Sequence, residues 1–276
     1  MKHFKYILPV IFLLFVCFAF TSRHQPSLDF ISKNTPHDTL RTINNEAFKR
    51  GEKIKYRLHY GFINAGEATL QVMEENKEIG GRSTYHIIGL GYSNSSFDWF
   101  YKVRDRYESY IDEKAILPWL FIRRVNEGGY IINQNQIYNH YKNTVDSDGK
   151  VMDVQEGVQD MISAFYYART IDFSNAKEGE VFEFPCFVDN EVWPLQMRFV
   201  GREVIKSDVG RIRCMKFRPV VQKGRVFKKE EDLTAWISDD KNKVPIRAEA
   251  KVLVGSIKMD ITECSGLANP LALVVK

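Results

Sequence analysis

The chain has 276 residues, enough for one large domain or two small ones, and its 44% hydrophobic and 27% charged residues are ordinary for a folded, water-soluble protein. Setting aside Lys2 and Lys5 of the N-terminal segment leaves 37 basic against 35 acidic residues, a balance of +2 that argues against a nucleic-acid partner. With 19 Phe and 13 Tyr, the composition favours sheet over helix.

The N-terminal segment 1–22 has the layout of a signal peptide. Lys2 and Lys5 supply a positive start, and the run from Ile7 to Phe20 contains no charged residue. This run is shorter than the roughly 20 residues that a membrane-spanning helix needs, so removal of 1–22 is favoured over a retained anchor. We therefore expect an exported protein of the periplasm or cell envelope, near a membrane only by proximity or through such an anchor.

Cys17 offers a third alternative, the attachment of lipid. A lipoprotein signal carries a small residue directly before its cysteine, whereas Val16 precedes Cys17 and the apolar run continues through Phe18. Lipoprotein attachment at Cys17 is therefore disfavoured.

The rest of the chain divides into three parts. Residues 23–47 are polar and without hydrophobic period, with Pro26 and Pro36, as is typical of a flexible linker. No boundary rich in proline, glycine or serine interrupts 48–264, which we expect to form a single curved, β-barrel-like domain. Residues 265–276 are expected to be a C-terminal tail.

The segment Gly51–Val72 begins the predicted sheet. Along its first half, Ile54, Tyr56, Leu58 and Tyr60 point one way, and Lys53, Lys55, Arg57 and His59 point the other. Side chains on a strand alternate between faces, so this strand has one buried and one solvated side. The alternation resumes at Ala68, Leu70 and Val72 after the glycine-bounded link 61–66, which predicts an antiparallel hairpin.

Further strands are predicted along most of the domain. The candidates are 85–90, 102–112, 119–125, 130–138, 141–145, 151–154, 181–188, 192–200, 211–219, 233–238, 246–254 and 257–263. Gly89 and Gly91 are expected to interrupt the first of these, before a loop over 92–98. The charged segment 223–232 is predicted to be a solvated hairpin tip.

One helix is predicted over 158–168. Val158, Met161, Ile162 and Phe165 fall at i, i+3, i+4 and i+7, on one stripe of a helix. Asp153, with Glu156 three residues later, is predicted to cap its start. The expected fold class is mainly β: an antiparallel, strongly curved sheet forming a barrel or half-barrel around or against this helix, because closure hides sheet edges.

Seven segments carry a resemblance to a known family. They are Gly51-Glu52 with Tyr56, Ala65-Gly66-Glu67, 97–111, Pro118, 158–169, 236–247 and Gly255. In this order they resemble an uncharacterised exported bacterial family catalogued as a domain of unknown function, DUF 3108. The resemblance implies an antiparallel β fold curled around a helix in the cell envelope, and it brings no catalytic residue. Carriers of lipoproteins share such a curled sheet, with an apolar cavity for lipid, as an analogy at the level of the fold.

No catalytic residue, metal site or cofactor is predicted. The sequence lacks Gly-x-Ser-x-Gly, His-Glu-x-x-His and any glycine-rich phosphate loop. The segment Asp146–Gly149 is predicted to be a hairpin turn rather than a calcium loop. His59, His86 and His140 have no carboxylate or cysteine at ligand spacing.

Cys186, Cys214 and Cys264 remain in the expected mature chain. An oxidising compartment permits a disulfide, but the number is odd, and Cys186 and Cys214 fall inside predicted strands where small apolar packing is common. Both alternatives stay open.

Asp105, Tyr107 and Arg169 are the candidate ligand-binding residues. Asp105 and Tyr107 share the predicted buried face of one strand, and Arg169 ends the helical stripe. Burying a charge is costly unless it is paired, so these groups are expected to face partners inside the barrel. These groups are expected either to form structural ion pairs or to bind a ligand.

Two classes of function follow. The first is a non-enzymatic binding or assembly protein of the envelope, with an apolar or amphipathic, lipid-like ligand or an envelope protein as partner. It predicts an elongated cavity lined by Tyr, Phe, Ile and Leu. The alternative is a hydrolase-type enzyme with an unrecognised site in the barrel, which predicts a pocket where titratable groups converge.

Overall fold

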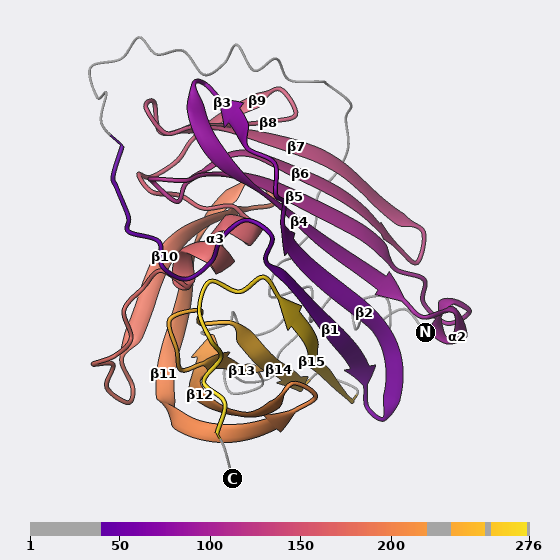
Figure 1. The fold of residues 1–276 in the computed structure, drawn as a ribbon. Coiled ribbons are helices and arrows are strands. Elements are labelled where there is room, and N and C mark those ends of the chain that lie inside the picture. The colour runs from indigo at the N-terminus through magenta and orange to yellow at the C-terminus, as the bar shows by residue number, and fades with distance from the viewer. Residues whose placement is uncertain (1–39, 220–232, 252–254, 275–276) are drawn as a thin grey trace.

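The computed structural model describes residues 40–219, 233–251 and 255–274, and most of them belong to one antiparallel sheet of 15 strands (Figure 1). The first strands are β1 (Lys53–Tyr60), β2 (Ile63–Val72), β3 (Lys77–Ile79), β4 (Arg82–Ser93), β5 (Arg104–Asp112), β6 (Pro118–Glu127), β7 (Tyr130–Asn139), β8 (Thr144–Ser147) and β9 (Lys150–Asp153). The others are β10 (Val181–Val188), β11 (Glu191–Ser207), β12 (Gly210–Pro219), β13 (Leu233–Ser238), β14 (Pro245–Lys251) and β15 (Ser256–Ser265), and the helices are α2 (Ser95–Asp98) and α3 (Met161–Ala168).

The sheet is built outward from β1. The predicted hairpin is confirmed, because β1 pairs with β2 and places Ile54 opposite Leu70. On its other side β1 pairs with β15, the last strand, and places Leu58 opposite Met259. Strands β2 to β9 therefore extend the sheet in one direction, and β15 back to β10 extend it in the other.

The sheet curves but does not close. Its two outer strands, β9 and β10, do not pair with each other in the described ranges, so the mainly β, antiparallel prediction is confirmed and a fully closed barrel is not. The segment that follows β9 crosses to β10 instead: Phe187 N donates to Gln159 O at 2.7 Å, and Gln159 N donates to Pro185 O at 2.9 Å. These bonds cover the edge of β10.

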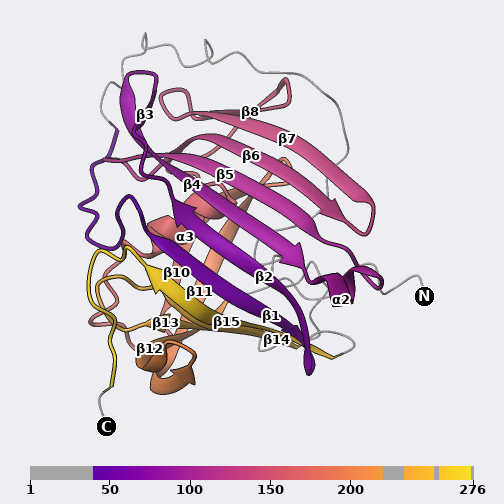
Figure 2. The ribbon, with the colours of Figure 1, turned by 45° about the vertical axis from the view of Figure 1, so that its right-hand side comes forward.

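Helix α3 lies between β4–β5 and β10 in both views (Figures 1 and 2). Its side chains enter two hydrophobic clusters. Met161, Ile162 and Tyr166 pack with residues of β4 to β7, whereas Ala164 packs with Phe184 of β10 and its neighbours. The helix thus shares its apolar surface between the two wings of the sheet.

Strand β4 continues through Gly89 and Gly91, so the predicted interruption and the loop from residue 92 are wrong. The reason is contact with the helix. A Cβ atom at Gly89 would lie 3.2 Å from Cδ1 of Ile162 and 3.3 Å from Cδ2 of Leu70. A glycine in a strand often marks such a close approach, and here it lets α3 pack on the sheet.

The helix begins later than predicted, and its cap is Asp160 rather than Asp153. The Asp160 carboxylate accepts hydrogen bonds from Ile162 N and Ser163 N, both at 2.7 Å, and Asp160 N donates to Ser163 Oγ at 2.8 Å. Ser109 Oγ on β5 donates to Asp160 Oδ2 at 2.6 Å. Asp153 stays in β9, opposite Thr144, and so cannot cap a helix.

Contacts with the sheet extend on both sides of the predicted domain 48–264. Arg41 Nε donates to Ala115 O at 2.9 Å and Ala47 is buried, so chain packing begins before residue 48. Val274 N donates to Arg211 O at 2.8 Å, which fastens the end of the chain to β12. The predicted signal over 1–22 with Cys17, the rest of the linker and the tip over 223–232 lie outside the described residues. Within the described ranges, neither α2 nor α3 has the length and apolarity to cross a membrane.

Cys186, Cys214 and Cys264 are free thiols, which decides the alternatives left open above. Asp146 Oδ1 accepts a hydrogen bond from Gly149 N at 2.7 Å between β8 and β9, so this segment is the predicted hairpin turn. No group of three metal-ligating side chains occurs in the part of the chain that the structure describes.

Substitution Asp160→Ala is expected to lower the free energy of unfolding by about 1–2 kcal/mol, because it removes the cap of α3 and the acceptor of Ser109. Asp153→Ala is the matched control and is expected to change stability by less than about 0.5 kcal/mol. Urea denaturation monitored by circular dichroism measures both. Equal losses in the two variants would contradict the assignment of the cap.

Candidate ligand-binding site

A cavity of about 160 Å³ lies between α3 and the sheet. Large apolar side chains form most of its wall: Tyr56, Leu58, Leu70, Tyr107, Ile162, Phe165, Phe173, Phe184, Leu195, Met197, Ile237 and Met259. Small residues make room between them: Ala68, Gly89, Ala164, Ala168, Ala235 and Ala248. The aromatic and aliphatic lining matches the lining predicted for a binding protein.

Two rows of cross-strand neighbours build the sheet side of this wall. The first row crosses β13, β14, β15 and β1, through Ala235, Ala248, Met259 and Leu58, each opposite the next. The second row crosses β2, β4 and β5, through Leu70, Gly89 and Tyr107. Residues directly opposite each other on paired strands share a face, so the strand registers alone bring these side chains together.

Several apolar side chains of the wall are only half-buried. Leu58, Leu70, Phe165, Leu195 and Met259 all retain solvent contact although they face the interior. The interior of a filled protein is close-packed and would bury such groups completely. The cavity is therefore open to solvent and has an apolar surface that a ligand can cover.

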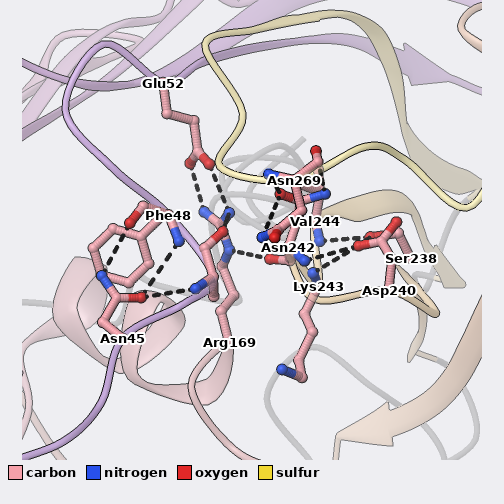
Figure 3. Close-up of polar contacts among 11 residues, drawn as sticks. Asn45, Phe48, Glu52, Arg169, Ser238, Asp240, Asn242, Lys243, Val244 and Asn269 are labelled. Carbon is pink, nitrogen blue, oxygen red and sulfur yellow. Dashed lines mark hydrogen bonds and ion pairs between the residues drawn. The ribbon is translucent and has the colours of Figure 1, made fainter.

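Arg169 lines the cavity and forms a buried ion pair with Glu52, which directly precedes β1 (Figure 3). The guanidinium donates from Nη1 to Glu52 Oε1 at 2.6 Å and from Nη2 to Glu52 Oε2 at 2.7 Å. The side chains are 2% and 0% exposed. A bidentate pair of this kind is both strong and specific in direction.

The remaining donors of Arg169 join two further segments. Nε donates to Asn242 O at 2.8 Å, in the loop between β13 and β14, and Nη2 donates to Ala47 O at 3.1 Å. The rings of Phe48 and Tyr166 face the guanidinium at 5.4 and 5.1 Å. Burial alone would lower the pKa of Arg169, but the Glu52 carboxylate outweighs it and the pKa is raised.

The loop over 239–244 carries another charged residue of the cavity wall, Lys243. Asp240 Oδ1 accepts hydrogen bonds from Asn242 N at 2.9 Å and from Lys243 N at 3.2 Å. The Asn242 side chain donates to Asn269 O at 2.9 Å and accepts from Asn269 N at 2.8 Å (Figure 3). The loop is thus fixed by its own side chains and by the C-terminal segment.

Asp105 lies elsewhere, in a buried acid pair with Glu127. Its Oδ1 accepts a hydrogen bond from Asn126 N at 3.0 Å, and the two carboxyl groups line a separate space of about 40 Å³. Burial raises the pKa of Asp105 to about 6, and burial together with the charge of Asp105 raises that of Glu127 to about 8. The pair therefore holds a proton at neutral pH.

Sequence reasoning placed the three candidate residues on inward faces, and all three are buried there. Tyr107 and Arg169 both line the main cavity, whereas Asp105 does not. Glu52, Glu127 and Lys243 were missed. The partner of Glu52 lies far away in the sequence, that of Glu127 lies on another strand, and Lys243 reaches the cavity through the loop between β13 and β14, so no spacing within the chain signals these positions.

The surroundings of His86 also differ from what spacing along the chain indicates. Its ring lies between two carboxylates, with Nδ1 at 2.8 Å from Glu75 Oε1 and Nε2 at 2.7 Å from Glu108 Oε2. The ring also stacks on Tyr110, at 4.2 Å between centroids. Pairing of β4 with β5 brings Glu108 to this position, which spacing along one strand does not show.

Comparison with known proteins identifies one family and several similar solved structures. The family described as "Protein of unknown function (DUF3108)" matches residues 55–262, which confirms the resemblance. No curated protein matches the chain significantly.

The solved structures that resemble this chain differ widely in sequence. A beta-barrel-like protein of domain of unknown function DUF1849 from Brucella abortus has 9% identity and a TM-score of 0.52, over 82% of this chain and 99% of that one. A candidate lipoprotein from Parabacteroides distasonis has 11% identity and a TM-score of 0.37, over 82% and 100%. The lipoprotein LppX from Mycobacterium tuberculosis has 14% identity and a TM-score of 0.22, over 79% and 87%. The first likeness supports the β-barrel-like fold, and the other two carry no argument.

Substitution Arg169→Met is expected to lower the free energy of unfolding by about 3–5 kcal/mol, because it leaves the Glu52 carboxylate buried without its partner. The double variant Glu52→Gln with Arg169→Met is expected to lose less than the sum of the single losses. Lys55→Met is the control, since it breaks the exposed pair with Glu263 and is expected to cost less than about 1 kcal/mol. Urea denaturation measures the parent, both single variants Glu52→Gln and Arg169→Met, the double variant and the control, and additive losses would disprove the coupling.

The acid pair predicts a dependence of stability on pH. Burial and the charge of Asp105 raise the pKa of Glu127 from 4.5 to about 8, so the folded chain holds a proton that the unfolded chain has released. Unfolding then releases protons, and the free energy of unfolding falls as pH rises. His140 acts oppositely, because burial lowers its pKa from 6.5 to about 4, but its contribution is complete above about pH 6.5.

Between about pH 6.5 and 8, the free energy of unfolding is therefore expected to fall, and Glu127→Gln is expected to flatten this fall. Glu67→Gln, at an exposed position on β2, serves as control and should keep the slope of the parent. Denaturant titrations across this pH range provide the measurement. A parent whose stability rises over the same range would refute the assignment.

Proposed function

The chain belongs to the DUF3108 family of proteins of unknown function, and we propose that it is an exported, non-enzymatic binding protein of the cell envelope. Its ligand is apolar or amphipathic, of the lipid class, and occupies the cavity between α3 and the sheet. The single observation that carries this proposal is the open cavity, in whose apolar wall several side chains are only half-buried.

The energy of binding comes from covering that wall. Removing apolar surface from water contributes about 25 cal/mol per Å². Half-buried side chains such as Leu58, Phe165 and Met259 still offer such surface inside the fold. A hydrocarbon group needs no directed partner, which fits a wall with few polar atoms.

The size of the cavity limits what it encloses. Its volume of about 160 Å³ is close to that of an engineered apolar cavity of about 150 Å³ that holds one benzene. One ring or a short length of hydrocarbon chain therefore fits inside. The rest of a longer ligand would lie along the open side, where Phe165 and Leu195 are half-exposed.

The alternative, a hydrolase-type enzyme, has one observation in its favour. Asp105 and Glu127 share a proton beside a small space, as acid–base pairs in enzymes do. That space of about 40 Å³ admits water but no organic substrate. Ligand binding is therefore the function that the geometry supports better than hydrolysis. If the chain binds no ligand, the remaining role is binding of a protein partner in envelope assembly.

Substitution Ala235→Phe is expected to reduce binding of a neutral apolar probe, N-phenyl-1-naphthylamine, at least tenfold, because the new ring occupies the cavity. Thr234→Phe is the matched control: Thr234 lies opposite Glu249 on the other face of β13 and should leave binding unchanged. Fluorescence titration of the purified chain gives both affinities.

Native mass spectrometry of the protein purified from its own envelope supplies an independent test. A co-purifying lipid that is absent from the Ala235→Phe variant supports the proposal. Equal probe binding by the parent and both variants would refute it.

A further inference from the structure

Three cationic residues, and no acidic residue, line the part of the cavity wall that the structure describes. The cations are Arg169, Lys243 and Arg247. This part of the wall therefore offers no carboxylate to a cationic headgroup, whereas an anionic headgroup would find cations. The sign of the wall selects among amphipathic ligands.

Two of these cations already have protein partners. Arg169 is neutralised by Glu52, as described above. Arg247 pairs with Asp260 at 2.5 Å and donates to Lys206 O at 3.0 Å. Both charges are paired within the fold, so neither cation is available to bind a ligand headgroup.

Lys243 differs from both. Among the described residues its ammonium makes no hydrogen bond and no ion pair, and Figure 3 shows its side chain extending away from the bonded network of the loop. The side chain is half-buried at the cavity wall. Burial lowers the pKa of this ammonium and so does the neighbouring Arg169 charge, while the carboxylates of Asp172, Asp240 and Glu46 act in the opposite sense without bonding to it. A half-buried cation without a bonded partner is costly to the fold.

The backbone at Lys243 adds a second cost. Its φ is +48°, in the left-handed region that glycine and asparagine adopt more readily than lysine. Nothing in the loop requires a long side chain at this position, because the hydrogen bonds to Asp240 come from the main chain. The fold thus holds an unfavourable residue in place, with its side chain at the cavity wall.

We propose that the ligand is an anionic amphiphile, whose carboxylate or phosphate headgroup binds Nζ of Lys243 and whose hydrocarbon chain lies in the cavity. This inference rests on the proposed function and names the chemistry of its ligand. The chain would run along the row formed by Ala235, Ala248, Met259 and Leu58, whose first two members lie on the strands that the loop carrying Lys243 connects. The headgroup supplies the missing partner of the ammonium, and the tail covers the half-buried wall.

The test compares three ligands with the same tail: dodecanoate, dodecyl phosphate and dodecan-1-ol. Isothermal titration of the parent is expected to show tighter binding of at least one anion than of the alcohol. Lys243→Gln is expected to weaken binding of that anion by about 10- to 100-fold, because a charged hydrogen bond is lost. Binding of the alcohol should be unchanged. Whether dodecanoate or dodecyl phosphate loses more tells a fatty acid from a phosphorylated lipid.

Lys241→Gln is the matched control, in the same loop but exposed and paired with Glu46 at 2.8 Å, and it should bind all three ligands like the parent. Lys243→Arg keeps the charge and should keep the preference for the anion. If the alcohol binds while Lys243→Gln retains the parent's preference, the inference fails and the proposed function stands. If none of the three ligands binds, both fail.

Discussion

The ion pair between Arg169 and Glu52 is the interaction on which the architecture depends. It joins the end of α3 to the start of β1, two points 117 residues apart in the sequence, and it does so without contact with water. Through Asn242 the same guanidinium fixes the loop between β13 and β14. The helix, the start of the first strand and the wing that contains β13 and β14 therefore meet at one charged group. Leaving either partner alone in this environment is far costlier than losing a surface pair, which ties the position of the helix to the first strand.

The cavity follows from that arrangement. The helix packs closely on β4 at Gly89, and the rest of the wall combines large apolar side chains with small residues such as Ala235 and Ala248. The registers of β13, β14, β15 and β1 place an apolar row where a closed barrel would place a packed core. Leu58 and Met259 of this row keep contact with solvent although they line the cavity. An apolar interior and access from outside are thus two results of one topology.

Local patterns in the sequence predicted the parts of the fold that local physics decides. Strict alternation predicted the first hairpin, and the spacing of Met161 and Ile162 predicted the helix. Predictions failed where a distant contact decides: Gly89 stays in a strand because Ile162 packs on it, and Asp160 rather than Asp153 meets the helix start beside Ser109. For the site, inward faces were predictable for Tyr107 and Arg169. Glu52 and Lys243 were not, because their roles arise from pairings across the whole chain.

The three free cysteines of the described residues bear on how the protein withstands oxidation. A thiolate, not a thiol, reacts with oxidants and disulfides, so any environment that disfavours the charged form slows that chemistry. Burial raises the pKa of Cys186 and Cys264, and it raises that of Cys214 to about 12. Each sulfur therefore remains protonated at neutral pH, deep inside β10 and β12 or half-covered on β15. The sheet thus shields these thiols from oxidants, and the protein can keep unpaired cysteines in surroundings where exposed thiols would be cross-linked.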